Sequence, residues 1–391
     1  MNGNYQDWAK ETAKKIAEKM EWVSEKSKDK IPYTTVNGTH DNRLDPKIEF
    51  TPDNGPRWWC NGFWAGMMWL MYHETGNERY REIGEYTEKS LDSCFDYFYG
   101  LHHDVGFMWL PSAVADYRLT GSEDGKRRGL HAAALLAGRF NPVGRFIRAW
   151  NDPIVEAGKE AQALDNRGWA IIDCLMNIPL LYWASDMTKD PRFKQIAMLH
   201  ADRAMECFVR PDGSVRHIVE FDPFTGVMVR DYGGQGYGDG SSWTRGQAWG
   251  LYGFVISYIH TGKQEYLDTA KKIAHYFMAN IPESGLIPVD FRQPKKPAWE
   301  DSTAAAIAAS GLLEISRQVG EYERDLYLNA AIKLLKALEE KRCSWGREND
   351  CILEKCTAAY HDKEHEFNII YGDYYFMEAV FKLKGDDVFL W

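Results

Sequence analysis

Two aspartates occur where a carboxyl group could act as an acid. Asp173 lies in residues 169–184, WAIIDCLMNIPLLYWA, with apolar residues on both sides. Asp173 could be structural, capping or hydrogen-bonding a neighbour. It could also be an acid, because an ionised carboxylate is costly to desolvate there and a raised pKa would let the group keep a proton to donate near neutral pH. Asp104, in HHDVGF, precedes another apolar run, where it could cap a helix or act as a second carboxylate. Two carboxylates at one mouth would push each other's pKa values apart.

Further polar and aromatic residues suited to ligand binding follow later in the chain. His217 lies in HIVEF, and Gln235, Arg245 and Trp249 lie in GGQGYGDGSSWTRGQAW. This glycine-rich segment lacks GxxxxGK[ST] and follows no strand of a βαβ unit, which argues against a nucleotide site. A lone histidine is more often structural than functional. Arg245, near a predicted helix start, could form a forked pair with a carboxylate.

The segments that must position these residues predict helices of two kinds. Amphipathic charged patterns occupy residues 8–23, 79–98, 126–140, 192–208, 266–280 and 324–340. Patterns that are apolar on nearly all sides occupy residues 62–73, 106–117, 169–184, 243–259, 303–316 and 373–383. A helix that is apolar on every side belongs in an interior. The alternation predicts an all-α fold of six helical hairpins closed into a ring, which we expect to form a single domain over residues 1–391.

One departure from helical periodicity is expected in residues 212–231. This segment alternates apolar and polar residues about DPFTG, which predicts a β-hairpin inserted in a loop. Because the inner helices would all run the same way, their amino ends should meet at one mouth, where backbone N–H groups and helix dipoles favour an anion. The polar residues near those ends are Asn61, Asp104, Asp173, Arg245, Asp301 and Asp373.

Composition limits the class of partner. The formal net charge is −10 without a basic run, which argues against nucleic acid, and an anionic ligand would need local positive charge. The 15 tryptophans and 21 tyrosines suit stacking on sugar rings. Seven scattered cysteines indicate a reducing compartment. The amino terminus lacks an apolar signal core and no run reaches membrane-spanning length, so we expect a cytoplasmic protein with no membrane partner, metal ion or cofactor.

Six sequence blocks together resemble glycoside hydrolase family 88, the unsaturated glucuronyl hydrolases. They are WCNGFWAG, HHDVGF, IIDCLMNIPLLYWA, SSWTRGQAWGLYGF, DSTAAAIAASGLLE and YGDYYFMEA, in order between residues 58 and 380. The resemblance implies an (α/α)6 barrel that removes a 4,5-unsaturated uronic acid from the non-reducing end of lyase-generated oligosaccharides, such as glycosaminoglycan disaccharides. It implies hydration of the C4=C5 vinyl ether rather than attack at the anomeric carbon.

The resemblance also implies roles for single residues. Asp173 falls on the catalytic acid and base, and Asp104 on the second essential carboxylate. The positions that fall on sugar-contacting residues are His217, Gln235, Arg245, Trp249, Trp59 and Trp150, with His103, Tyr360 and His361 aligned beside them. Trp58, next to Trp59, is an alternative for that stacking position.

Two departures from the family pattern affect what the mouth should bind. Some relatives recognise sulfate with an arginine in the glycine-rich loop and a Ser-x-x-Ser-x-Lys run, where this chain has AYHDKE with Ala359, Asp362 and Glu364. These acids would repel a sulfate, so we expect weak use of substrates that depend on that contact. The long stretch of residues 151–169 is expected to reshape the mouth.

Three alternatives remain open from the sequence. The related unsaturated rhamnogalacturonyl hydrolases of family 105 share the barrel and the double-bond chemistry. HDKEH at residues 361–365 satisfies the H-x-x-E-H pattern of zinc peptidases, although zinc would need a third ligand. A non-catalytic sugar-binding barrel would use the same aromatic residues for stacking and the acids for hydrogen bonds alone.

Overall fold

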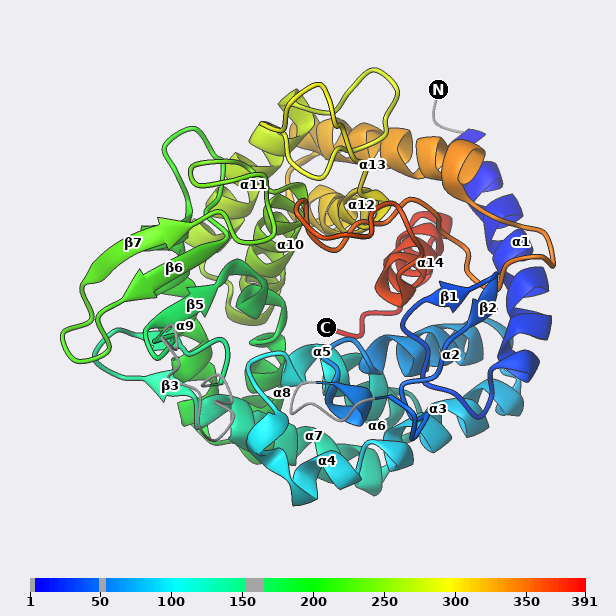
Figure 1. The fold of residues 1–391 in the computed structure, drawn as a ribbon, viewed down its shortest axis with the longest axis horizontal. Coiled ribbons are helices and arrows are strands. Elements are labelled where there is room, and N and C mark those ends of the chain that lie inside the picture. The colour runs from blue at the N-terminus through cyan, green and yellow to red at the C-terminus, as the bar shows by residue number, and fades with distance from the viewer. Residues whose placement is uncertain (1–3, 49–53, 152–164) are drawn as a thin grey trace.

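The protein folds into two concentric rings of helices. The computed structural model describes residues 4–48, 54–151 and 165–391. The charged segments form the outer ring, with α1 (Asn4–Lys26), α3 (Glu78–Ser90), α7 (Glu123–Ala137), α9 (Pro191–Phe208), α11 (Gln264–Ala279) and α13 (Glu321–Arg342). The apolar segments form the inner ring, with α2 (Gly62–Thr75), α5 (Val105–Trp109), α6 (Ala115–Thr120), α8 (Pro179–Thr188), α10 (Thr244–Thr261), α12 (Ser302–Gln318) and α14 (Ile370–Lys384). Contacts of α14 with α2 and α1 close the ring, which confirms the predicted (α/α)6 barrel (Figure 1).

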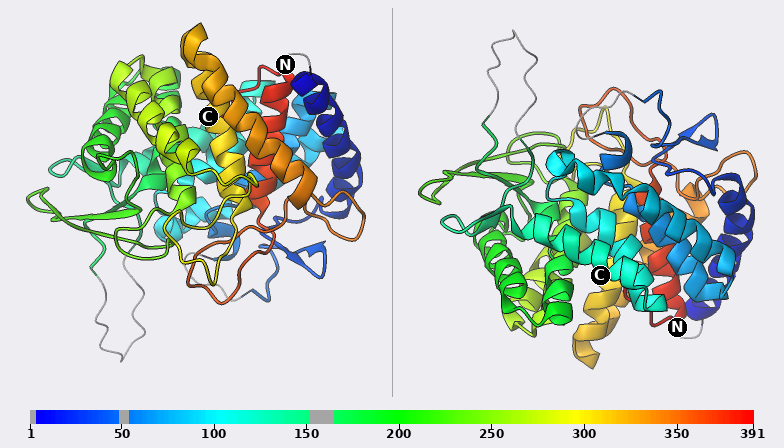
Figure 2. Two further views of the ribbon diagram at one scale, coloured as in Figure 1. Left: turned by 90° about the horizontal axis from the view of Figure 1, so that it is seen from above. Right: turned by 90° about the horizontal axis from the view of Figure 1, so that it is seen from below.

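Long and short connections segregate to opposite ends of the barrel. The inner helices pass to the outer ones through two-residue turns such as 76–77, 121–122 and 262–263, where Gly76, Gly121 and Gly262 adopt the left-handed conformation that ends a helix. The long connections enter the inner helices at their amino ends, and Figure 2 shows these loops gathered at one end of the molecule. This end is the predicted mouth. The stretch expected to reshape it falls mainly on residues 152–164, which lie outside the described residues.

The prediction of one continuous helix over residues 169–184 is wrong. Residues 169–171 form strand β5 (Trp169–Ile171), a 3₁₀ turn follows over residues 172–176, and α8 begins at Pro179. Strand β5 pairs antiparallel with β6 (Ile218–Phe221), so its backbone groups find partners outside the local sequence. Proline at the first helical position explains the late start of α8.

The prediction of one regular helix over residues 106–117 also fails. A wide π turn at residues 110–114 separates α5 from α6 and contains Pro111. Proline removes a backbone N–H and clashes with the carbonyl four residues earlier, which opens the turn.

The hairpin predicted within residues 212–231 is confirmed. Strand β6 pairs with β7 (Met228–Tyr232), and Asp222 accepts the backbone N–H groups of Phe224 and Thr225 at the turn. The sheet has the order β5-β6-β7, so the hairpin also holds the segment that leads into Asp173. Two short hairpins, β1 (Thr35–Val36) with β2 (Thr39–His40) and β3 (Phe140–Asn141) with β4 (Phe146–Ile147), complete the described strands.

The end of the barrel opposite the mouth is closed by the chain after α14. The Trp391 ring stacks on Tyr375 with ring centres 5.7 Å apart, and its indole N–H donates to Glu378 at 2.6 Å. Lys382 lies beside Glu378, with Nζ 3.5 Å from one carboxylate oxygen, and 2.9 Å from Glu314. All of these side chains are buried, so the charges of Lys382, Glu314 and Glu378 are compensated by one another and not by water.

The predictions about membrane-spanning length and about the cysteine thiols can be compared with the structure. None of the helices in the described residues combines the length and hydropathy that a membrane-spanning helix needs. The seven cysteines are free thiols, as their scattered spacing predicted.

The buried ion cluster predicts a large effect of Lys382→Met on stability. The change leaves Glu314 and Glu378 buried without their cation, so the free energy of unfolding should fall by about 3–5 kcal/mol. Urea unfolding followed by tryptophan fluorescence would measure it, with the exposed Lys363→Met as the matched control. Equal midpoints for the two variants would contradict the importance of the cluster.

Candidate active site

The structure brings Asp104 and Asp173 together at the mouth, with His103 between them. His103 Nε2 lies 3.5 Å from an oxygen of Asp104 and 3.5 Å from an oxygen of Asp173. The His103 side chain is fully buried, whereas Asp104 and Asp173 keep 8% and 17% of their side chains exposed. Asp173 is therefore the more accessible of the two carboxyl groups.

Backbone pairing fixes the position of Asp173. Ile171 pairs with Ile218, and the Ile172 N–H donates to the carbonyl of His217 at 3.1 Å. Asp173 follows directly in the 3₁₀ turn, so the β5–β6 pairing sets where its side chain leaves the backbone. The local sequence predicted helix here, and only the hairpin partner redirects it.

Three side chains lie against the Asp104 carboxylate. One oxygen lies 3.2 Å from His102 Nδ1, and the other lies 3.5 Å from His103 Nε2 and accepts a hydrogen bond of 3.1 Å from the amide of Asn177. The His103 backbone N–H donates to the carbonyl of Ala149 at 3.2 Å, which anchors the segment before α5. Asp104 is thus held as an acceptor of hydrogen bonds, an arrangement that suits its charged form.

The surroundings shift the pKa values of the two carboxyl groups in opposite directions. Burial raises the pKa of Asp173 well above its ordinary value, the charge of Asp104 raises it further, and Arg245 offsets only part of this. Burial acts in the same direction on Asp104, but His103, His102 and Asn177 together outweigh it, so the pKa of Asp104 lies below its ordinary value. Burial also lowers the pKa of His103 to about 4. The surroundings therefore favour the proton on Asp173 and the charge on Asp104.

His217 presents a ring nitrogen that the protein leaves without a partner. Its Nδ1 lies 3.0 Å from the backbone nitrogen of Gln235 and 3.3 Å from the carbonyl oxygen of Gly233, whereas Nε2 has no partner among the described residues. Burial lowers the pKa of His217 to about 3, so the ring is neutral. A Cβ at residue 234 would lie 2.1 Å from the His217 ring, so Gly234 permits the loop to close over it.

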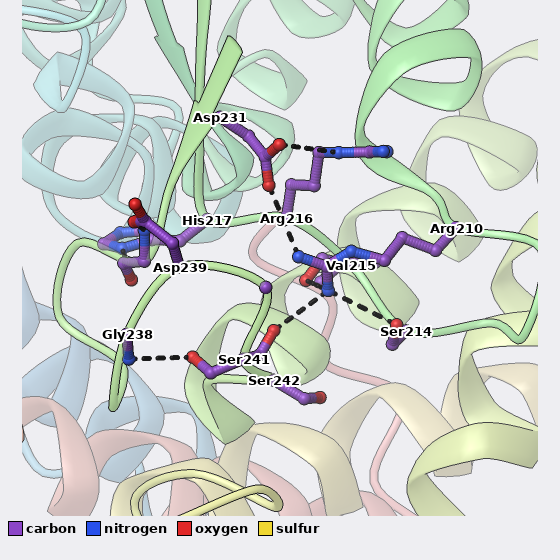
Figure 3. Close-up of polar contacts among 12 residues, drawn as sticks. Arg210, Ser214, Val215, Arg216, His217, Asp231, Gly238, Asp239, Ser241 and Ser242 are labelled. Carbon is purple, nitrogen blue, oxygen red and sulfur yellow. Dashed lines mark hydrogen bonds and ion pairs between the residues drawn. The ribbon is translucent and has the colours of Figure 1, made fainter.

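An arginine pair ties the glycine-rich loop to the hairpin that carries His217. Figure 3 shows Arg210 reaching the carbonyl of Ser241, at 2.9 Å, and Asp231 of β7, at 3.5 Å. Arg216 Nε lies 3.4 Å from the other oxygen of Asp231. Arg210 therefore joins the loop to β7, and Arg216 contacts the same aspartate from the segment before β6.

Gln235 and Arg245 join the glycine-rich loop to the segment before α14. The Gln235 side chain donates to the carbonyl of Ala358 at 3.0 Å, and Arg245 donates to Asp301 and to the carbonyls of Thr357 and Ala358. The forked pair expected of Arg245 is not formed: one guanidinium nitrogen contacts one oxygen of Asp301, and the other donates to the carbonyl of Ala358. Its charge still acts on Asp173, and a direct sugar contact by Arg245 stays a prediction.

The predicted stacking tryptophans occupy different environments. Trp59 lies among rings of the inner wall, 5.4 Å from Phe107 and 5.1 Å from Tyr371 between ring centres. Its neighbour Trp58 instead packs against Tyr33 and Arg43. Trp249 is fully buried against Phe107, whereas Trp150 is 37% exposed at the rim and lies 5.8 Å from Trp169.

Tyr360 and His361 lie at the rim rather than beside the aspartates. The Tyr360 hydroxyl donates to the carbonyl of Pro297 at 2.9 Å, and the His361 ring lies 2.8 Å from the carbonyl of Tyr237. Tyr360 connects to the site through its backbone N–H, which donates to the Gln235 carbonyl at 2.9 Å. Their sugar contacts stay predictions.

The zinc-peptidase alternative finds no support around HDKEH. The segment lies in a loop, the rings of His361 and His365 face backbone carbonyls, and no third ligand joins them in the described part of the chain. Elsewhere in those ranges, His102, His103 and Asp104 have donor atoms within 4.8 Å of one another, a spacing that a metal ion could also accept. Their contacts with each other, with Asp173 and with Asn177 already account for the acid–base arrangement described above.

Sequence reasoning missed two residues of this site. Asn177 is a second polar residue in the apolar run that contains Asp173, and this sequence signal could have found it. In the structure its side chain is fully buried. His102 adjoins His103, but nothing in the sequence indicated which of the two histidines faces Asp104 alone and which lies between both aspartates.

Comparison with known proteins places this geometry in context. The family model described as Glycosyl Hydrolase Family 88 matches residues 16–391. An unsaturated glucuronyl hydrolase of Bacillus sp. (strain GL1) is 38% identical over 338 residues, which cover 83% of this chain and 86% of that protein. An unsaturated chondroitin disaccharide hydrolase of Streptococcus pyogenes serotype M1 is 32% identical over 84% of this chain and 82% of that protein.

Solved structures agree with the sequence comparison. The unsaturated glucuronyl hydrolase from Bacillus sp. GL1 has a TM-score of 0.83 at 34% identity, over 97% of this chain and 96% of that one. An aspartate-to-asparagine mutant of the Streptococcus agalactiae unsaturated glucuronyl hydrolase, complexed with dGlcA-GalNAc6S, has a TM-score of 0.81 at 26% identity, over 99% and 94% of the two chains.

The electrostatic coupling predicts the effect of Asp104→Asn on the titration of Asp173. Removing the charge of Asp104 takes away an effect that disfavours ionisation, so the pKa of Asp173 should fall. Carboxyl ¹³C NMR over a pH series would measure it, with Asp362→Asn in an exposed loop as the control. An Asp173 carboxyl that titrates at its ordinary value in the unchanged protein would contradict the proton placement.

Proposed function

Because the chain belongs to glycosyl hydrolase family 88 and is an unsaturated glucuronyl hydrolase, we propose that Asp173 hydrates the double bond of a 4,5-unsaturated uronate at the non-reducing end of a glycosaminoglycan-type fragment. The observation that carries this proposal is the pair of carboxyl groups that both contact His103 and whose pKa values are shifted in opposite directions. The vinyl ether of such a uronate is electron-rich at C4, and Asp173 holds a proton that it can give.

The reaction begins with transfer of the Asp173 proton to C4. The C4=C5 π electrons form the new C4–H bond, and positive charge develops at C5, where the ring oxygen shares it. The carboxylate left on Asp173 then takes a proton from a water molecule as that water adds to C5. Asp173 is thereby returned to its acid form, and the net change is one water added across the double bond.

The product of hydration is a hemiketal at C5. It opens by cleavage of the bond between C5 and the ring oxygen, which leaves a ketone at C5 and a hemiacetal at C1. The hemiacetal collapses to an aldehyde and releases the neighbouring sugar. No step needs a cofactor or an oxidant.

The remaining residues of the mouth are suited to an anionic sugar. Asp104 stays charged beside the site and stabilises the positive charge that develops at C5. The unpartnered Nε2 of His217 is available to the sugar, and the amino ends of the inner helices face the same mouth. We assign Trp59 and Trp150 to stacking on the sugars, and Gln235, Arg245, Trp249, Tyr360 and His361 to the sugar-contacting surface or its support.

Two broader assignments complete the proposal. Residues 1–391 act as one catalytic domain, since α1 and α14, from opposite ends of the sequence, close the same ring. The seven free cysteines support a reducing, cytoplasmic location.

Replacing Asp173 with Asn should lower kcat by about 10³-fold or more, because the variant has no proton to give to C4. Loss of ultraviolet absorbance at the unsaturated uronate band would measure turnover of chondroitin, hyaluronan, heparin and gellan disaccharides, with a pectin-derived disaccharide to test the family 105 activity. Calorimetric binding of the disaccharide should persist in the variant. Unchanged turnover would refute the assignment, and binding without turnover in the unchanged protein would support the non-catalytic barrel.

The acids near the carboxyl terminus predict sulfate discrimination. Asp362 and Glu364 are exposed in the loop where some relatives carry sulfate-binding residues, so kcat/KM should be lower for a 6-sulfated than for an unsulfated chondroitin disaccharide. Glu364→Lys should raise the sulfated value by up to about fivefold and leave the unsulfated value unchanged. Equal gains on both substrates would argue against a sulfate-specific effect.

A further inference from the structure

The side chain of Asn177 connects the two aspartate-bearing segments. It is fully buried, and its amide nitrogen donates to a carboxylate oxygen of Asp104 at 3.1 Å and to the backbone carbonyl of Asp173 at 3.2 Å. Its amide oxygen accepts the backbone N–H of Phe107 at 2.7 Å. One side chain thus contacts the segment that carries Asp104 and the segment that carries Asp173.

Asn177 is also held through its backbone. Its N–H donates to the carbonyl of Cys174 at 2.9 Å and ends the 3₁₀ turn that carries Asp173. The N–H of Phe107 lies in the first turn of α5, where no acceptor exists within the helix. Asn177 supplies that acceptor from another segment, so the helix that follows Asp104 is fixed to the turn that contains Asp173.

We propose that Asn177 is a positioning residue, which holds Asp104 against Asp173 and, as a donor to the Asp104 carboxylate, keeps the negative charge on Asp104 and the proton on Asp173. The inference rests on the proposed function and extends it by one residue. It separates two roles of one side chain, the acceptor role toward Phe107 and the donor role toward Asp104.

Gly106 allows this contact to form. A Cβ on Gly106 would lie 2.4 Å from the Asn177 Cα and 2.6 Å from its side-chain oxygen, so no larger residue fits there without displacing Asn177. Gly106→Ala therefore provides a second way to disturb the same contact without changing the amide itself.

The donor role predicts that Asn177→Asp lowers kcat although the two side chains have nearly the same shape. The variant keeps an oxygen for Phe107 but places a carboxylate, in place of a donor, against Asp104. The kcat should fall by about 10²-fold while KM changes little, because Asn177 does not face the sugar. The acidic limb of the pH–rate profile should move to higher pH, because loss of a donor to the charged form of Asp104 raises its pKa.

Asn141→Asp is the matched control. Asn141 also donates to one backbone carbonyl, that of Pro223, and accepts one backbone N–H, that of Gly144, but lies outside the site. This control should leave kcat and the pH profile unchanged. Gly106→Ala should reproduce the lower kcat in a chain that still has the amide.

The test compares kcat, KM and the pH–rate profile of the four proteins on an unsaturated chondroitin disaccharide, with Asp104 followed by carboxyl ¹³C NMR. An acidic limb and an Asp104 titration in Asn177→Asp that match the unchanged protein would overturn the inference. If the unchanged protein fails to turn over the disaccharide, the proposed function fails, whereas the NMR titration still decides the role of Asn177. If Asn177→Asp does not fold, a wild-type Asn177 side-chain amide ¹⁵N signal that shifts as Asp104 titrates supports the inference, and one that stays constant overturns it.

Discussion

The protein depends on one electrostatic constraint, that in a buried site the charge of one carboxyl group disfavours ionisation of the other, as Asp104 does for Asp173. His103 lies 3.5 Å from an oxygen of each. Because this histidine is itself buried and neutral at neutral pH, it does not supply a permanent cation that would let both groups ionise. The hydrogen-bond donors around Asp104 decide which of the two keeps the charge. An acid with a raised pKa is thereby obtained beside a carboxyl group whose own pKa is lowered.

The barrel makes this arrangement possible because its closed end stabilises the fold and its mouth carries the residues that meet a ligand. The end opposite the mouth is sealed by Trp391, Lys382 and their buried carboxylate partners, and the two-residue turns there leave little to vary. The mouth receives the long connections, so the residues that meet a ligand lie on segments whose backbone is free to depart from helix. Strand β5 and the 3₁₀ turn after it are the clearest example, since they interrupt an apolar segment to place one acid.

The segments around the site hold one another through contacts that involve few sugar-facing groups. Arg210 fixes the hairpin against the glycine-rich loop, and Arg245 is fixed against the segment before α14 through the carbonyls of Thr357 and Ala358. Much of the positive charge near the mouth is therefore structural. The Nε2 of His217, in contrast, has no partner among the described residues.

The sequence by itself determined the ring and the mouth, because an apolar or amphipathic period is local information that decides which helices face inward. It also marked Asp173, since a polar residue in an apolar run is visible without any partner. Only the tertiary structure decided that residues 169–171 are a strand, because their partner β6 is distant in the sequence. The role of His103 between the aspartates, the attachment of Arg245 to Asp301 and the link made by Asn177 were likewise fixed by contacts between separate segments. Such contacts leave no period in the sequence, since each depends on how closely two remote backbones approach.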